Sequence, residues 1–410
     1  MKFLIVAPKY KTRVGESYDF PLGLAYISSS LKHNGYLVEC LNLNHYDEPL
    51  EMLLKKEIMG KDIDIVCTGG LSVHFNMIKT ILDIAQSIKP DIITIIGGGI
   101  VSSEPELMLN ALKTNFGIIG EGEKTIVELA DAIINGKNYE SVNGIIYYDS
   151  NKRLITNPPR ISVEDIDSIP YPDYEGFELN KFLEMQGTND NAYTYIFDKP
   201  RMAPIISSRS CPYKCTFCYH PLGNKYRQRS LDGFFAEIDY LVGKYSMNML
   251  AIYDEVFAID KKRMKHICTR IKKYDLKWIG QLRVDNVDEE MLYMLKDAGL
   301  FYISYGLESA SNTILKSMKK HITLSQIETT LRLTKEAKIG IQGNFIFGDT
   351  SETCETASET LDWWLKHREY QINLTAIAAY PGCSLYCEAI TKEIITDKLA
   401  FIQAGCPPIT

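Results

Sequence analysis

The sequence predicts an α/β protein with two sheets: an amino-terminal doubly wound, Rossmann-like domain followed by a partial (β/α)6, TIM-like barrel. Three observations support this fold class. Short β-rich runs alternate with helical periodicity along most of the 410 residues, as in parallel α/β folds. The strands of the first half are almost continuously apolar, as expected for strands covered on both faces. Further strand–helix units recur through the second half, enough for an open barrel.

The first domain is expected over residues 1–140. Its helix at 73–88 shows the periodicity most clearly, because apolar residues such as Met77, Ile81 and Ile88 recur at helical spacing. The strands are expected at Lys2–Ala7, Tyr36–Leu43, Asp64–Thr68, Asp91–Ile96 and Phe116–Ile119, and the helices at 22–33, 50–59, 73–88, 104–113 and 123–135.

A linker is expected over residues 141–200, because periodicity weakens there and turn-forming residues gather. Asn157-Pro-Pro159 is one such cluster. The linker also contains a candidate hairpin from 144–148 to 154–155. The barrel is expected over 201–395, and 396–410 remain as a short carboxyl-terminal tail.

Polar residues follow the strands predicted for the barrel. Active sites of such barrels lie at the carboxyl ends of the strands, so these polar residues are site candidates. The strands are expected at Ile205–Ser208, Met249–Tyr253, Trp278–Leu282, Tyr302–Tyr305, Ile341–Phe347 and Ile372–Ala379; the candidates are Asp254, Glu255, Arg283, Glu308, Ser309 and Gly348 with Glu352.

Composition excludes several function classes. The formal net charge of −7 argues against a nucleic-acid partner, which requires a positive surplus. The longest apolar stretch, 92–101, is interrupted by glycines and is too short for a transmembrane segment. The apolar run at the start of the chain is too short for a signal peptide. The ten cysteines are mostly scattered, which fits a reducing compartment. These features predict a cytoplasmic protein.

Three cysteines lie within eight residues, at Cys211, Cys215 and Cys218. Thiolates favour iron–sulfur clusters, zinc or copper(I), and closed structural sites normally use four ligands. Three thiolates can hold a cubane cluster and leave its fourth iron open for chemistry. The alternative is a zinc knuckle completed by His220. The trio is therefore the candidate metal site and catalytic centre.

The cysteine spacing, with Phe217 directly before the third cysteine and a predicted strand before the first, resembles the radical S-adenosylmethionine (radical SAM) enzymes. The resemblance implies a [4Fe–4S] cluster whose open iron binds the amino and carboxylate groups of SAM. It also implies reductive cleavage of SAM to a 5'-deoxyadenosyl radical, and an electron donor such as flavodoxin or ferredoxin.

The same resemblance implies roles for residues of the barrel. Asp254 or Glu255 would contact the ammonium of SAM, Glu308 and Ser309 the ribose, and Gly348 would flank the adenine. Arg283 could pair with the carboxylate of SAM, since a guanidinium suits bidentate capture. A salt bridge within the barrel is the alternative for this arginine.

Glycine-rich turns follow three strands of the first domain, at Gly69-Gly-Leu-Ser72, Gly97–Gly99 and Gly120-Glu-Gly-Glu123. In this order they resemble the cobalamin-binding domain that precedes the barrel in a large radical SAM class. The resemblance implies that Ser72, Gly97, Gly98 and Gly99 line the pocket for the dimethylbenzimidazole tail.

One departure from other corrinoid proteins concerns the lower ligand of cobalt. The loop after the first strand, 8–16, has no histidine, and His45 and His74 follow other strands, where a turn or cap role is expected. If cobalamin binds, its lower face is then weakly ligated or bare, which favours transfer of a methyl group from the upper face.

The leading hypothesis is a cobalamin-dependent radical SAM enzyme that methylates an unactivated carbon of a small-molecule or lipid substrate. A second SAM would restore methylcobalamin. A radical cyclase or rearrangement enzyme with the same cofactors is one alternative. A non-catalytic corrinoid or iron–sulfur carrier is an alternative from another class.

Overall fold

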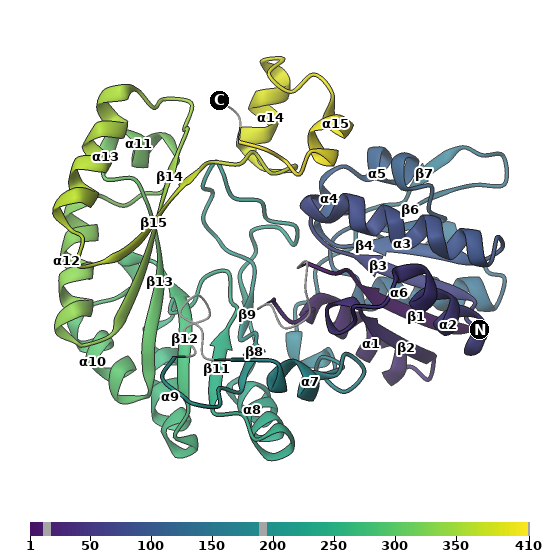
Figure 1. The fold of residues 1–410 in the computed structure, drawn as a ribbon, viewed down its shortest axis with the longest axis horizontal. Coiled ribbons are helices and arrows are strands. Elements are labelled where there is room, and N and C mark those ends of the chain that lie inside the picture. Colours follow the sequence, from purple (N-terminus) through teal and green to yellow (C-terminus); the bar gives the residue numbers. More distant parts are fainter. Residues whose placement is uncertain (11–17, 188–194, 409–410) are drawn as a thin grey trace. The chain divides into compact units, whose positions relative to one another are not determined.

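In the computed structural model, residues 1–10, 18–187 and 195–408 are described. The chain divides into two compact units (Figure 1). The first comprises residues 1–185, 380–382 and 386–407, and the second 186–379, 383–385 and 408–410. No helix in the described part of the chain is long and apolar enough to cross a membrane.

The sheet of the first unit has the strand order β2-β1-β3-β4-β5-β6-β7. Its first five strands are parallel, and the order reverses beside β1, as in doubly wound folds. The hairpin expected within the linker extends this sheet, because β6 pairs antiparallel with β5. The strands are β1 (Lys2–Ala7), β2 (Leu37–Asn42), β3 (Ile65–Gly69), β4 (Ile93–Gly97), β5 (Phe116–Ile118), β6 (Ile145–Tyr148) and β7 (Leu154–Thr156).

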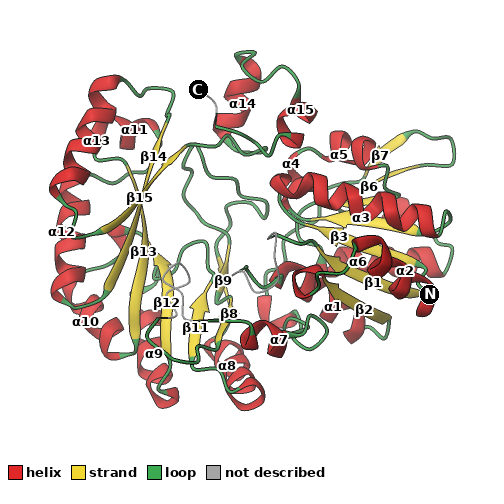
Figure 2. Ribbon diagram, viewed as in Figure 1, coloured by secondary structure: helices red, strands yellow, loops and turns green. Residues whose placement is uncertain are grey.

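Helices cover both faces of this sheet (Figure 2). On one side Leu54 of α2 and Ile81 of α3 pack against Leu4 and Val6 of β1. Helix α3 buries the apolar stripe that its periodicity predicted, which includes Ile78 and Ile81. The helices are α1 (Leu22–His33), α2 (Leu50–Gly60), α3 (Phe75–Ile88), α4 (Gly99–Ser103), α5 (Pro105–Leu112), α6 (Glu123–Ile134) and α7 (Leu179–Glu184).

The carboxyl-terminal segment 386–407 returns to the first unit after the barrel. Helix α15 (Lys398–Gln403) contributes Ile402 to a core cluster with Phe75 of α3. Glu104 accepts hydrogen bonds from Tyr386 Oη at 3.0 Å and from Lys398 Nζ at 2.9 Å. Residues 386–395, expected in the barrel, and 396–407, expected in a short tail, thus both belong to the first unit.

The sheet of the second unit is entirely parallel, with the order β15-β14-β13-β12-β11-β8. This confirms the partial six-stranded barrel. Its strands are β8 (Met202–Ile205), β11 (Met249–Ile252), β12 (Lys277–Leu282), β13 (Leu300–Glu308), β14 (Gly340–Phe347) and β15 (Gln371–Ala376).

The first barrel strand ends earlier than predicted, so the expectation of a strand at Ile205–Ser208 is wrong beyond Ile205. Ser208 and Arg209 instead form β9, which pairs antiparallel with β10 (Arg227–Gln228). The cause is Asp254, whose carboxylate accepts the backbone N–H groups of Ser207 and Ser208.

Most helices of the second unit begin at side chains that cap their free N–H groups, the helix Asn312–Ser317 being an exception. Asp288 accepts from the N–H of Met291, and Thr323 forms a capping box with Gln326. Figure 2 shows the helices on the outer side of the curved sheet. They are α8 (Leu231–Tyr245), α9 (Lys261–Ile271), α10 (Glu289–Asp297), α11 (Asn312–Ser317), α12 (Leu324–Glu336) and α13 (Cys354–Lys366).

Candidate active site

The three cysteines lie on one loop, which follows β9 and precedes β10. Backbone hydrogen bonds hold this loop: Thr216 N–H donates to the Met318 carbonyl at 3.1 Å, and Cys218 N–H to that of Cys215 at 3.2 Å. The loop begins at Ser210, whose φ of 67° is unusual for a residue with a Cβ. Strained backbone of this kind is common at functional sites.

The surroundings act differently on the three thiols. A hydrogen bond from Cys218 lowers the pKa of Cys215 to about 6, and the nearby charges of Lys320 and Arg283 act in the same direction. Burial raises the pKa of Cys211. The hydrogen bond to Cys215 and burial raise the pKa of Cys218. The surroundings therefore favour the thiolate, which is the form that binds metal, mainly at Cys215.

Several polar atoms around the cysteine loop indicate that a polar group fits here. Among the described residues, Thr216 Oγ1, His220 Nε2 and Asn286 Nδ2 are buried without a hydrogen-bond partner. Such atoms usually cost about 1–3 kcal/mol each unless something binds them. Thr216 lies between two of the cysteines, so the unsatisfied atoms and the thiols belong to the same region.

The side chains around the cysteine loop do not favour binding of a single metal ion. In the described part of the chain, no three His, Cys, Asp or Glu side chains are placed to hold one ion. A cubane cluster binds each cysteine through a different iron atom, so it does not require such convergence. His220, the fourth ligand in the zinc alternative, instead has its Nδ1 3.2 Å from Glu255 Oε2.

The structure separates the two carboxylates that the sequence left as alternatives. Asp254 is buried and accepts four hydrogen bonds of 2.6–3.1 Å from the backbone and hydroxyl groups of Ser207 and Ser208. Burial raises the pKa of Asp254. Glu255 is exposed, and within the described residues its carboxylate contacts His220, so it is the carboxylate with capacity for a ligand.

Arg283 adopts the salt-bridge arrangement that the sequence left open. Its Nε and Nη2 donate to the two carboxylate oxygens of Asp285 at 2.9 and 3.0 Å, and Nη2 also donates to the Lys320 carbonyl. The guanidinium lies 3.6 Å from the centre of the Tyr213 ring. Its contacts thus tie the end of β12 to the loops around the cysteines.

Glu308 pairs with Lys320, a residue that the sequence analysis did not select. Lys320 Nζ lies 2.7 Å from Glu308 Oε1, and both side chains are buried. Gly306 leaves room for the pair, because a Cβ there would lie 2.7 Å from Lys320 Nζ. Lys320 also influences Cys215 electrostatically. The Phe217 ring centre lies 5.9 Å from the same ammonium.

Two further predicted residues have mainly backbone or packing roles. Ser309 is buried, and its Oγ lies 2.9 Å from Thr360 Oγ1 of α13. Gly348 has a φ of 107°, a conformation that favours glycine, and its N–H donates to Glu352 Oε2. Their contacts with SAM stay predictions.

The glycine turns of the first unit meet at the carboxyl ends of β3 and β4. A Cβ on Gly69 would collide with the Gly97 carbonyl, and one on Gly98 would lie 2.9 Å from that of Gly70. Gly99 begins α4 directly after these turns. Ser72 is buried nearby, with its Oγ 3.5 Å from Ser103 Oγ. These two turns, here together called the glycine cleft, contact each other at the carboxyl edge of the sheet, which is where doubly wound folds bind their ligands.

The two histidines of the first unit are engaged by protein groups. His74 Nδ1 accepts the N–H of Leu71 at 3.1 Å, which is a turn role. His45 is buried, with Nε2 2.6 Å from Tyr18 Oη and Nδ1 3.1 Å from Glu178 Oε2. Most of the loop predicted to lack a cobalt ligand, 11–16, lies outside the described residues.

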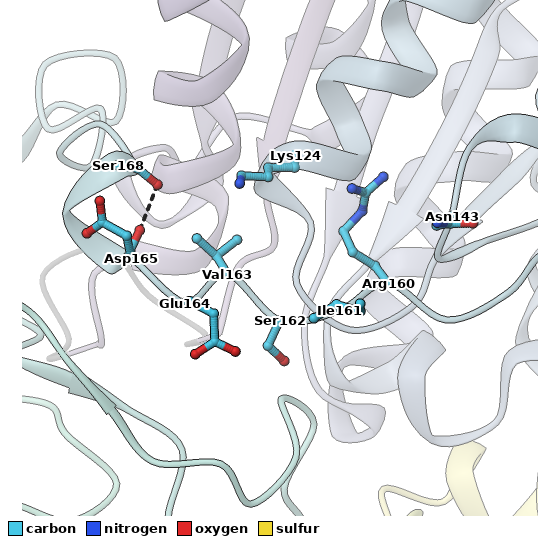
Figure 3. Close-up of a pocket in the computed structure, with 9 residues that line it drawn as sticks. All are labelled: Lys124, Asn143, Arg160, Ile161, Ser162, Val163, Glu164, Asp165 and Ser168. Atoms are coloured by element: carbon cyan, nitrogen blue, oxygen red, sulfur yellow. Dashed lines mark hydrogen bonds between the residues drawn. The ribbon is translucent and has the colours of Figure 1, made fainter.

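A separate pocket of about 500 Å³ lies in the first unit, around the segment 160–168 and the start of α6 (Figure 3). Arg160 lines it, but its side chain already pairs with Glu128 and donates to Thr125 Oγ1. Lys124 and the carboxylates of Glu164 and Asp165 also line it. No motif in the sequence indicates this pocket, and none of the candidate residues lines it.

Protein-family models match parts of both units. Residues 205–363 match the Radical SAM superfamily, and residues 13–130 match the B12 binding domain. An uncharacterized methyltransferase of Pyrococcus horikoshii is 28% identical over 96% of this chain and 84% of its own length. The anaerobic magnesium-protoporphyrin IX monomethyl ester cyclase of Rubrivivax gelatinosus is 28% identical over 97% of this chain and 71% of its own.

Solved structures share the fold. The radical SAM methyltransferase TsrM of Kitasatospora setae, bound to tryptophan and a SAM analogue, superposes with a TM-score of 0.79, 19% identity, and coverage of 96% of this chain and 76% of TsrM. The cobalamin-dependent radical SAM enzyme OxsB, with aqua-cobalamin bound, gives 0.73 at 22% identity, covering 99% of this chain and 57% of OxsB.

A doubly wound sheet with a glycine cleft, joined to an open barrel with three cysteines at its mouth, defines a two-domain corrinoid and iron–sulfur enzyme. The chain belongs to the radical SAM enzymes that carry an amino-terminal B12 binding domain. Its cofactors are a [4Fe–4S] cluster, SAM and cobalamin.

Proposed function

We propose that this chain is a cobalamin-dependent radical SAM methyltransferase that adds a methyl group to an unactivated carbon of a small-molecule substrate. The observation that carries the proposal is the presence of the cysteine loop and the glycine cleft in one chain. Its similarity to a named methyltransferase over 96% of the sequence supports the same reaction. When bound, SAM on the reduced cluster supplies the 5'-deoxyadenosyl radical, and cobalamin supplies the methyl group.

The residues of the barrel receive the following proposed roles. Cys211, Cys215 and Cys218 hold the cluster. Glu255 accepts from the ammonium of SAM, since a carboxylate facing an ammonium is a strong, charge-assisted bond. Glu308 accepts from the ribose hydroxyls, and Lys320, whose Nζ lies 2.7 Å from Glu308 Oε1, holds that carboxylate in position.

Other proposed roles concern shape and support. Gly348, whose positive φ favours glycine, has no Cβ and so leaves room for the adenine. Arg283 acts through Asp285 and the Lys320 carbonyl as a positioning residue. In the first unit, Ser72 and Gly97–Gly99 line the pocket for the cobalamin tail.

A radical cyclase is the second candidate, because the Rubrivivax gelatinosus cyclase matches over nearly the whole chain. The two reactions differ in the mass of the product: methylation adds one methyl group, and cyclisation adds none. The electron donor is proposed to be a flavodoxin or ferredoxin, and the compartment the reducing cytoplasm that the scattered cysteines suggest.

The test is anaerobic reconstitution of the chain with iron, sulfide and cobalamin, followed by reduction in the presence of SAM labelled with deuterium in its methyl group. Formation of 5'-deoxyadenosine supports radical generation, and a deuterated methyl group in the product supports methyl transfer. A reduced, cluster-loaded protein that leaves SAM intact would refute the proposal and favour a non-catalytic carrier.

A further inference from the structure

The two faces of the barrel sheet differ in chemistry. Register and burial assign each residue of β12, β13 and β14 to one face. Tyr305 lies on the helix-covered face, because its hydroxyl is 3.0 Å from Thr334 Oγ1 of α12. Its register partners Leu282 and Gly343 are buried with it. The residues that alternate with these lie on the opposite, inner face.

The lower part of the inner face is apolar. Met202, Met249 and Ala251 form a buried cluster there, against which Ile279 and Phe301 pack. These residues come from β8, β11, β12 and β13, near the amino ends of the strands. Filling of this kind is usual in a barrel interior, and it forms a floor to the inner face.

Above this floor the inner face carries amide and hydroxyl side chains. One row follows the register Gln281–Ser304–Gln342–Gln371 across β12, β13, β14 and β15. The next row toward the carboxyl ends follows Gly306–Asn344–Asn373. Barrel interiors are normally filled by branched apolar residues at such positions, so packing does not explain these polar rows.

The amides are accessible and only partly used. Tyr302 Oη donates to Gln371 Oε1 at 2.7 Å, and Asn373 Nδ2 donates to Asn344 Oδ1 at 3.2 Å. Within the described residues, the side chains of Gln281, Ser304 and Gln342 have no protein hydrogen-bond partner. All three are exposed or half-buried, so each has donor or acceptor capacity for a bound molecule.

The rows continue directly into the candidate SAM site. Asn344 is the register partner of Gly306, the glycine that leaves room for Glu308 and Lys320. A molecule that binds to the amide rows would therefore lie next to the groups assigned to the ribose of SAM. The floor below and the SAM site above make these rows the part of the face suited to a substrate.

We infer that the rows from Gln281 to Gln371 and from Gly306 to Asn373 bind the substrate, and that this substrate is a small uncharged molecule rich in amide or hydroxyl groups. The inference rests on the proposed function and specifies its substrate class. Side-chain amides both donate and accept, so they match neutral groups that do the same. A lipid chain would leave these amides unpaired, and sites built of polar groups reject such ligands strongly. The row residues themselves are uncharged, and the ammonium beside Gly306, that of Lys320, is already paired with Glu308, so it is not free for the carboxylates of a tetrapyrrole.

The test uses the full chain loaded with cluster and cobalamin, and equilibrium binding of four probes. Two probes are neutral and polar: N-acetyl-glycyl-glycinamide presents amide groups, and methyl glucoside presents hydroxyl groups. Comparing the two shows which of these groups the rows bind. The other two are methyl laurate, which is apolar, and protoporphyrin, which is anionic. The variants Gln342→Leu and Asn344→Leu are compared with Gln403→Leu, a change at an exposed amide of α15.

Saturable binding of at least one polar probe is expected, weakened about tenfold by each substitution in the rows and unchanged in Gln403→Leu. Tighter binding of methyl laurate or protoporphyrin, polar probes unaffected by the row variants, or no binding of either polar probe would overturn the inference. SAM cleavage by the wild-type chain is measured in parallel. Its absence would refute the proposed function, whereas its presence with a failed probe pattern would refute only the substrate class.

Discussion

The ammonium of Lys320 and the carboxylate of Glu308 form a buried ion pair with a separation of 2.7 Å. The pair connects the end of β13 to the loop after α11, and that loop also receives the N–H of Thr216 from the cysteine loop. One buried contact thus joins the proposed ribose site to the proposed cluster site.

Replacing Lys320 with methionine should destabilise the protein by about 3–5 kcal/mol, because it leaves a buried carboxylate unpaired. The double variant Lys320→Met/Glu308→Leu should recover most of this loss, because it removes both charges of the pair and leaves neither one unpaired. Urea unfolding followed by circular dichroism measures the difference. Equal losses in the single and double variants would contradict the pairing.

Replacing Cys215 with alanine should abolish both the visible absorption of the reconstituted cluster and SAM cleavage. The physical reason is that two thiolates cannot hold three corners of a cubane. Cys354→Ala is the matched control, since Cys354 is exposed and opens α13. It should retain both properties, and cleavage of SAM by the Cys215 variant would refute the ligand assignment.

The neighbouring carboxylates Asp254 and Glu255 should respond differently to conversion into amides. Glu255→Gln should weaken SAM binding about 10–100-fold while leaving the fold intact, since it removes one charge-assisted bond. Asp254→Asn should lower stability, because an NH2 group replaces one carboxylate oxygen and can no longer accept the hydroxyls of Ser207 and Ser208. Isothermal titration with SAM and thermal melting separate the two effects. A melting temperature lowered only in the Glu255 variant would reverse the assignment.

Alanine at Gly69 should reduce cobalamin affinity and stability, because its Cβ would collide with the Gly97 carbonyl and force the glycine cleft open. A loss of about 1–3 kcal/mol is expected from such strain. Gly60→Ala is the control, since a Cβ there meets nothing within 4 Å. Cobalamin titration followed by absorbance measures the affinity, and equal affinity in both variants would argue against the cleft as the binding site.

Asp173 should make the first unit sensitive to acid. Burial opposes its ionised form, but Lys32 Nζ at 2.6 Å and the Ser28 hydroxyl outweigh burial and hold the pKa of Asp173 below its ordinary value of 3.8. A lowered pKa means that this stabilisation is fully present above about pH 3.8 and is lost as the pH falls through the lower, folded-state pKa. Asp173→Asn should therefore cost about 1–3 kcal/mol at neutral pH.

The stability gap between wild type and Asp173→Asn should close in acid. Denaturant unfolding at a series of pH values measures it. A gap that stays constant down to the lowest pH would show that the carboxylate charge is not what stabilises the contact.

Local patterns in the sequence predicted most of the fold, because periodicity and glycine turns are local features. The helix at 73–88 and the strand at Lys2–Ala7 appear almost as expected. The early end of β8 depends on Asp254, which is 46 residues from Ser208. No pattern within the strand itself could predict it.

The site was predictable only where a motif marks it. The spacing of the cysteines identified their loop, but Lys320 follows another lysine and looks like an exposed charge in the sequence. Its burial results from Glu308 and Gly306, which β13 brings to it. The polar rows of the barrel were missed for a related reason: Gln342 and Asn373 belong to different strands, and only strand register places them in adjacent rows.

The return of residues 386–407 to the first unit has a consequence for biosynthesis. Ile402 and Cys406 complete a core whose amino-terminal members, such as Phe75, leave the ribosome hundreds of residues earlier. During translation, part of the apolar surface of the amino-terminal unit therefore stays uncovered until the barrel has emerged from the ribosome. A chaperone that binds nascent chains would find its target on α3 throughout that interval.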